Sequence, residues 1–221
     1  MNFPDGLFAP AWAWGGLLPA LAALGWATRT APWRRLADGR QLHGWLGSIV
    51  VLTLMWSISA GVRPGLNMHM LGATALTLMF GRQLAIAGLG LVLAAVTVNG
   101  GAGWQAFALN ALVLAVLPPF LAHAILRLME RLLPAHLFVY IFVGAFFGAA
   151  AAMILTGLAA TLLLAAAGTY PLPMLLSDYF PYYILLGFAE AWMNGAAITL
   201  LVVYYPHWVG TFDDRRYLWN K

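Results

Sequence analysis

The sequence has no cysteine, and this absence excludes disulfide bonds, thiolate metal ligands and cysteine nucleophiles. Charged residues are also scarce, at 8% of the 221 residues, whereas a soluble domain typically carries about 25%. Hydrophobic residues make up 63% of the chain, and the mean hydropathy is +0.84. No soluble fold can hide this much apolar surface, so we expect an all-α, polytopic helical bundle that lies in the membrane.

Catalytic signatures are missing as well. The chain has no Walker A pattern, so it cannot hydrolyse ATP through a P-loop. It also lacks kinase, hydrolase and zincin motifs, and no internal period indicates a repeat protein. We therefore expect a protein that is not an enzyme and forms a single membrane domain. Its parts are an N-terminal insert (1–9), a helical bundle (10–205) and a tail (206–221).

Apolar runs, separated by polar residues and Gly/Pro clusters, predict about seven membrane spans. Their approximate limits are 10–28, 42–61, 68–81, 83–99, 105–129, 136–168 and 180–205. The third run gives only about 21 Å of helix, which is short for an apolar core of about 30 Å. Such short helices occur where they line a cavity rather than lipid. The sixth run is long for one span, so it is tilted, projects beyond the bilayer or breaks at Gly157.

Basic residues predict the orientation of these spans, because Lys and Arg collect on the cytoplasmic side. With the N-terminus outside, Arg63 falls outside and the other basic residues fall inside: Arg29, Arg34, Arg35, Arg40, Arg82, Arg127, Arg131, Arg215, Arg216 and Lys221. The net charge of +4 and the pI near 9.7 then report a membrane face rather than a nucleic-acid partner. We expect a multi-pass protein of the bacterial cytoplasmic membrane that has the lipid bilayer as a partner and has its C-terminus inside.

One histidine stands apart from the other four. His43, His123, His136 and His207 lie near the inner ends of spans, where interfacial anchoring accounts for them. His69 opens the short third span, in LNMHMLG, at the outer side. It is either an interfacial histidine bonded to backbone or a metal ligand, since neutral imidazole is the commonest such ligand.

Methionines flank His69 on both sides. On a regular helix, Met68, His69 and Met70 point about 100° apart and cannot all face one ion, but they can if 67–69 is still a loop. Thioether sulfur then favours Cu(I). The alternative is that both methionines only fill space in the core.

Other polar side chains interrupt the apolar runs. Glu190 lies mid-span with Asn194 one turn later, and the pair is either a buried helix–helix hydrogen bond or part of a transport path. Asn110 is a second buried amide. Asn99 opens the outward loop NGGAG, whose glycines permit close approach of another segment. A GxxxG pattern at 144–148 indicates a helix contact.

Four stretches resemble segments of the CbiM/NikM family, in the same order along the chain. MNFPDGLF is similar to the family's N-terminal Met-His-Ile-Pro-Asp-Gly, and NMHMLGATAL to its Val-His-Leu-Leu-Gly. NGGAGWQAFALNAL is similar to its Gly-Asp-Gly-Gly … Gly-Ala-Asn-Ala segment, and LLGFAEAWMNG to its closing helix with a central Glu. The resemblance implies seven spans and a subunit that captures cobalt or nickel for an energy-coupling-factor ABC transporter. Separate ATPase and coupling membrane subunits would be its partners.

The resemblance also implies a metal site. The family holds its metal through the α-amine of residue one, the amide nitrogen and imidazole of a histidine at position two, and the histidine of the short span. Carried over, the ligands of Ni, Co or Cu are Met1, Asn2 and His69. Because position two is Asn here, one imidazole is lost, and its place falls to the Asn2 carboxamide, a water or a methionine sulfur. Further candidates, as ligands or as supports of ligands, are Met68, Met70, Asn99, Asn110 and Glu190.

The first residues gain a role from this scheme. MNFPDGLF lacks the basic region of a signal peptide, so we expect no cleavable signal. Pro4-Asp5-Gly6 predicts a tight turn, which Asp5 caps, that feeds Met1 into the bundle, with the loop NGGAG packed against it. The missing histidine also supports an alternative, namely an orphan or accessory protein of the same fold that handles copper or supports metalloenzyme assembly.

Overall fold

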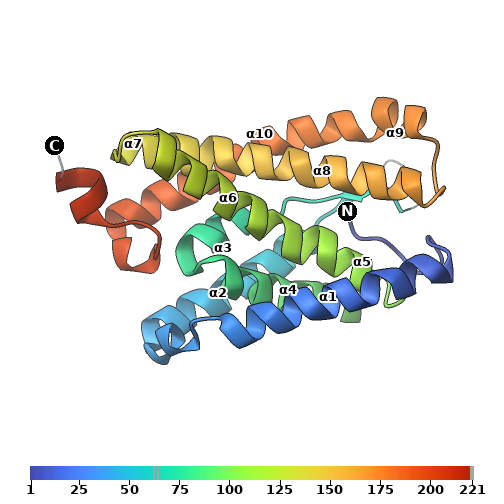
Figure 1. Cartoon of the computed structure of the whole chain (residues 1–221), viewed down its shortest axis with the longest axis horizontal. Coiled ribbons are helices and arrows are strands. Elements are labelled where there is room, and N and C mark those ends of the chain that lie inside the picture. Colours follow the sequence, from blue (N-terminus) through green and yellow to red (C-terminus); the bar gives the residue numbers. More distant parts are fainter. Residues whose placement is uncertain (62, 64, 220–221) are drawn as a thin grey trace.

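The computed structural model describes residues 1–61, 63 and 65–219, and it shows a bundle of helices (Figure 1). The first half of the chain contributes α1 (Pro10–Thr30), α2 (Gly39–Ser57), α3 (Ala73–Phe80) and α4 (Arg82–Val98). Next comes one long helix, made of α5 (Phe107–Asn110), a π-helical stretch (Ala111–Val116) and α6 (Leu117–Leu132). The helices thus lie close to the ranges expected from the apolar runs, except that α2 ends at Ser57 rather than at residue 61 and that the third run differs more strongly.

The last third of the chain forms an antiparallel pair of long helices. The first member comprises α7 (Leu137–Val139), a π-helical stretch (Tyr140–Phe147) and α8 (Gly148–Ala166). The second comprises α9 (Leu172–Asp178) and α10 (Phe180–Tyr204). Three stretches of the described residues are long and apolar enough to cross a membrane, namely Phe107–Leu132, Leu137–Ala166 and Leu172–Tyr204, and Arg82–Val98 is a shorter apolar helix. The chain is therefore a helical membrane protein.

The third run departs from its expected helix. Helix α3 begins only at Ala73, and Asn67–Met68 instead form strand β2, which pairs antiparallel with β1 (Ala60–Gly61). Gly72 precedes the helix in a left-handed conformation (φ 65°), which glycine adopts without steric cost. His69 consequently lies in extended chain before the helix, and the expected helix over 68–81 is wrong in its first turn. Seven of the eight α3 residues are buried, as expected for a short helix enclosed by protein.

Glycines allow close helix packing in the last third of the chain. Helix α8 runs through Gly157 without interruption, so a break there is wrong. A Cβ at this position would lie 2.1 Å from Tyr183 Cγ, which shows that the missing side chain makes room for the α10 tyrosine. The GxxxG pattern is a helix contact as predicted, because Gly144 faces Met129 and Gly148 faces Ile125 of α6.

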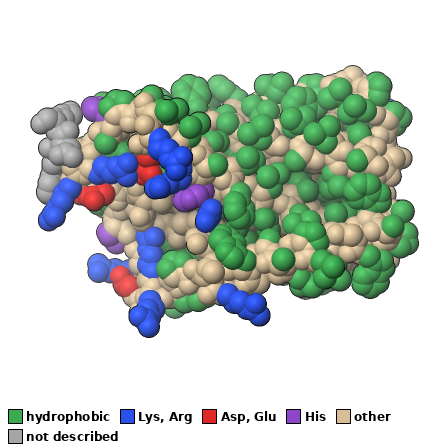
Figure 2. All heavy atoms as spheres, viewed as in Figure 1, with side chains coloured by type: hydrophobic (Ala, Val, Ile, Leu, Met, Phe, Trp, Pro, Cys, Tyr) green, Lys and Arg blue, Asp and Glu red, His purple; other side chains and the backbone are tan. Residues whose placement is uncertain are grey.

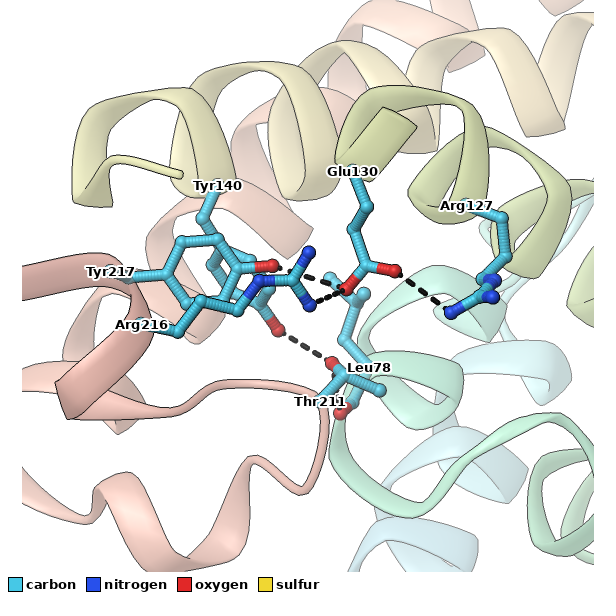
Figure 3. A network of polar contacts seen from close by, with 7 residues as sticks. All are labelled: Leu78, Arg127, Glu130, Tyr140, Thr211, Arg216 and Tyr217. Carbon is cyan, nitrogen blue, oxygen red and sulfur yellow. Dashed lines mark hydrogen bonds and ion pairs between the residues drawn. The ribbon is translucent and has the colours of Figure 1, made fainter. Parts of the chain in front are cut away.

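The C-terminal tail folds back onto one end of the bundle. Gly210 N–H and Thr211 Oγ1 donate to the carbonyls of Met79 and Leu78, which are left without helical partners where α3 ends. Thr211 Oγ1 also bonds Tyr140 OH at 2.7 Å (Figure 3). The tail is therefore part of the packed structure over its described residues; Lys221 lies outside them.

Glu130 of α6 forms ion pairs and a hydrogen bond where the C-terminal tail packs on the bundle. Its side chain is 10% exposed and accepts hydrogen bonds from Arg216 (2.8 Å) and Tyr217 (3.3 Å) of the tail and from Arg127 (3.2 Å) of α6 (Figure 3). Burial, together with the Glu130 carboxylate, raises the pKa of Tyr217 to about 12. The tyrosine therefore remains a hydrogen-bond donor at neutral pH.

Charge is distributed unevenly over the molecule. On the face shown in Figure 2, Lys and Arg side chains gather at the end where the C-terminal tail lies, and apolar side chains cover the rest. Large apolar residues are exposed along α2 and α10, for example Val50, Leu54, Leu185 and Phe188. A belt of this kind is expected where lipid replaces water as the solvent.

Candidate metal site

The chain begins inside the bundle rather than on its surface. Met1, Asn2 and Phe3 are 0%, 2% and 0% exposed. Phe3 is held by Asn110, which accepts from Phe3 N–H at 2.9 Å and donates to Phe3 C=O at 3.0 Å. Gly103 N–H donates to the same carbonyl at 2.9 Å. These hydrogen bonds hold the backbone of the N-terminal segment at Phe3, so that Met1 lies in the interior of the bundle.

The turn that follows is anchored to the outward loop. Gly6 has a left-handed φ of 77°, which closes the turn after Pro4-Asp5. Asp5 is exposed, and its Oδ1 accepts from Gln105 N–H at 2.7 Å. A Cβ on Gly103 would overlap the Asp5 backbone nitrogen at 2.3 Å, which confirms that the glycine loop packs against the insert. Asp5 therefore caps the neighbouring loop rather than its own turn.

His69 meets the inserted segment at its second residue. Its Nε2 lies 3.1 Å from Asn2 Oδ1, and its Nδ1 lies 3.0 Å from Met70 C=O. Nδ1–H donates to Met70 C=O, because a carbonyl only accepts, and Nε2 faces the Asn2 carboxamide. A histidine that binds metal through Nε2 has its other nitrogen held by backbone in the same way.

Aromatic packing fixes the orientation of the His69 ring. Trp56 of α2 is 1% exposed, and its ring centroid lies 4.8 Å from that of the imidazole. Trp56 Nε1–H donates to Leu71 C=O at 3.1 Å, so the indole is itself held. Trp56 cannot be singled out from the sequence, because it is one of 10 tryptophans in the chain and no local pattern sets it apart.

The Met1 amine lies beside Asn67 of β2. It donates to Asn67 C=O, and Asn67 Oδ1 lies 3.3 Å away. Burial lowers the pKa of the Met1 amine well below its ordinary value of 8.0. The neutral amine, which alone has a free lone pair, is therefore favoured at neutral pH. Asn67 was not among the expected residues, although it is adjacent to the NMHM motif.

Glu190 and Asn194 hold the segment that follows His69. Glu190, which is 2% exposed, accepts from the N–H groups of Leu71 and Gly72, the latter at 3.0 Å. Asn194 Nδ2–H donates to Glu190 Oε2 at 2.6 Å, and its Oδ1 accepts from Ala75 N–H at 2.7 Å. The pair therefore links α10 to the start of α3 through buried hydrogen bonds.

The remaining candidates lie around the site in different ways. Asn110 contacts the insert through the Phe3 backbone. Met68 is buried and Met70 is partly buried, and the latter offers its carbonyl to His69. Asn99 is exposed at the C-terminal end of α4, whereas Met1, Asn2 and His69 are buried. The structure thus brings together Met1, Asn2 and His69, and it leaves Asn99 on the surface.

A cavity connects this cluster with the loops at the same end of the molecule. Its volume is about 530 Å³, and it is lined by Asn2, Asn67, Asp5 and the glycine loop 100–103. Among the described residues, no group of three His, Asp or Glu side chains could hold a metal ion. A site built from a chain terminus, one carboxamide and one imidazole does not require such a group.

Comparison with known proteins places these features in a family. A family model described as cobalt uptake substrate-specific transmembrane region, CbiM, matches residues 2–208. A solved structure of a truncated transition metal transporter has a TM-score of 0.80 at 20% identity, over 92% of this chain and 99% of its own. A second transition metal transporter has a TM-score of 0.79 at 19% identity, over 94% and 96%. These two structures show the fold alone, and no curated protein matches the chain.

Proposed function

The chain belongs to the CbiM family of cobalt-uptake substrate-specific transmembrane proteins, and on this premise we propose that it captures a transition metal ion for an energy-coupling-factor ABC transporter. The family supports transition metal uptake as the general activity. The single observation that carries the specific proposal is the meeting of Met1, Asn2 and His69 in the buried interior. The metal is the substrate here, held on its way into the cell.

The donor atoms have a spacing suited to a metal ion. Two ligands that bind at right angles, each about 2.1 Å from the ion, lie about 3.0 Å apart. Asn2 Oδ1 and His69 Nε2 are 3.1 Å apart, so the two atoms can bind one ion between them. The neutral Met1 amine and the Asn2 backbone nitrogen supply further nitrogen donors. Such a set suits Ni(II), Co(II) or Cu(II), and the amide oxygen makes it weaker than a set with a second imidazole.

The orientation follows from charge. Lys and Arg gather at the end that carries the tail (Figure 2), and the positive-inside rule assigns that end to the cytoplasm. We therefore place the N-terminus outside, seven spans in the bilayer and the C-terminus inside. The cavity beside Asn2 and Asn67 is then the entrance for the ion. The proposed location is the bacterial cytoplasmic membrane.

Energy must come from elsewhere, because the sequence has no Walker A nucleotide site. We propose that separate ATPase and coupling membrane subunits supply it, and that they dock on the basic inner end. The second candidate function is an orphan protein of the same fold that handles copper or supports metalloenzyme assembly. The observation that favours it is Asn2, which replaces an imidazole donor by a weaker one.

Metal titration of the untagged protein tests the proposal. Intact mass must first show that the chain starts at a free Met1 amine. We expect about one Ni(II), Co(II) or Cu(II) ion per chain by isothermal titration, because the donors form a single site. His69→Ala should abolish binding, and Asn2→His should tighten Ni(II) binding. His43→Ala, an exposed histidine at the other end of α2, is the matched control. Absence of metal binding by the untagged wild-type protein would contradict the proposal.

A further inference from the structure

The hydrogen bonds of the Met1 amine converge on one residue. Met1 N lies within hydrogen-bonding distance of two oxygen atoms, and both belong to Asn67. One is the backbone carbonyl oxygen, and the other is the side-chain Oδ1, at 3.3 Å. A primary amine that binds a metal ion keeps two N–H groups and gives its lone pair to the ion, and these are arranged tetrahedrally with the bond to Cα. When both N–H groups point at Asn67, the direction of the lone pair is determined.

Asn67 is itself held in place. Its backbone lies in β2, where it pairs with Gly61 of β1. It is two residues before His69, so one short extended segment supplies both the acceptors for the amine and the imidazole. Its side chain is partly exposed and lines the cavity of about 530 Å³, whereas Met1, Asn2 and His69 are buried. Asn67 therefore lines the cavity together with Asn2, next to the buried donors.

Metal ligands in proteins are oriented by partners that bond their remaining polar groups, and loss of such a partner weakens binding about 10- to 100-fold. Backbone and ring partners already do this for His69, through Met70 C=O and Trp56. Asn67 is the corresponding partner of the amine. An Asp or an Asn can accept at Oδ1, but a leucine of similar size cannot.

We propose that Asn67 is a positioning residue for metal capture, which accepts both N–H groups of the Met1 amine and directs its lone pair to the ion shared with His69. The inference rests on the proposed function, because it requires a divalent transition metal bound by the chain terminus. It assigns a role to a residue outside the donor set.

Three substitutions at Asn67 test this role in the untagged, full-length protein with Ni(II) as the probe. Asn67→Leu and Asn67→Ala remove the Oδ1 acceptor and should each weaken Ni(II) binding about 10- to 100-fold. Asn67→Asp keeps the acceptor and should bind within a few-fold of the wild type. Gln105→Leu, which changes an exposed amide in the neighbouring loop, should bind like the wild type. Thermal melting and size-exclusion chromatography of each variant show that it is folded.

The visible spectrum of the nickel-loaded protein separates positioning from a merely structural effect. The d–d band should shift in Asn67→Leu at saturating Ni(II), because the amine is no longer aimed, and it should be retained in Asn67→Asp. Wild-type affinity and an unshifted band in Asn67→Leu would overturn the inference and leave the proposed function standing. Equal loss in Asn67→Asp and Asn67→Leu would overturn it too. No nickel binding by the wild type would overturn both.

Discussion

At the scale of single residues, the site depends on a chain terminus that is buried without its charge. The amine of an unfolded chain has a pKa of about 8, and burial lowers the pKa of the Met1 amine in the folded protein. Between these two values the unfolded chain binds more protons than the folded chain, so the free energy of unfolding increases with pH. Stability that depends on the neutral amine is lost as the pH falls below about 8.

We therefore predict that the melting temperature of the metal-free protein increases between pH 6 and pH 8.5. The effect is at most about 1.4 kcal/mol per pH unit from this one group. The measurement is a series of thermal melts in the presence of a chelator. The control is a chain extended by Gly-Ser before Met1, which moves the charged amine away from Asn67 and should remove this contribution. Identical pH profiles for the two chains would show that Met1 does not enter the site as a neutral amine.

At the scale of elements, the insert is held to the bundle by the helix α5. Asn110 satisfies both polar groups of the Phe3 backbone, and Gly103 leaves room for Asp5. The insert is therefore an extended segment whose backbone is hydrogen-bonded by a helix side chain and by a loop.

Asn110→Leu should release this insert. The substitution removes the Asn110 acceptor of the buried Phe3 N–H, which costs about 1–3 kcal/mol, whereas Phe3 C=O keeps its bond from Gly103 N–H. We expect faster hydrogen exchange over residues 2–6 and weaker Ni(II) binding. Thr156→Val is the control, since it changes a fully buried polar side chain that bonds only within α8, to Ala152 C=O. Unchanged exchange over residues 2–6 in Asn110→Leu would contradict this role.

Much of this element level could be predicted from the sequence, and the failures have physical causes. Apolar length locates the helices, and Pro4-Asp5-Gly6 predicts the turn, whereas the insertion of Met1 is what the family resemblance implies. The start of α3 was placed too early, because the partners of Leu71 and Gly72 N–H lie on Glu190, far along the chain. Trp56 and Asn67 were missed because their roles come from tertiary contacts that periodicity does not encode.

At the scale of the whole molecule, the packed tail and the basic end form one unit. Glu130 of α6 bonds Arg216 and Tyr217 of the tail (Figure 3). Thr211 of the tail bonds the Leu78 carbonyl of α3. The proposed docking surface for coupling subunits is thus continuous with α3, which begins four residues after His69. The short helix contacts the tail at its C-terminal end, through Leu78 C=O and Met79 C=O.

The proposed orientation is testable because the chain has no cysteine of its own. Single substitutions Ser177→Cys and Arg40→Cys place an exposed thiol at opposite ends of the bundle. With the N-terminus outside, a membrane-impermeant maleimide should label Ser177→Cys in intact cells and should label Arg40→Cys only after lysis. The cysteine-free parent is the control. The reverse labelling pattern would show that the basic end faces outward.

The most direct measurement is anomalous diffraction from crystals of the untagged protein loaded with nickel. The account predicts one strong peak between the Met1 amine and His69 Nε2, about 2.1 Å from each. It also predicts that the peak is lost in His69→Ala. A loaded crystal with no peak at this position, or with its peak elsewhere in the chain, would contradict the claim that the chain terminus and His69 hold the metal.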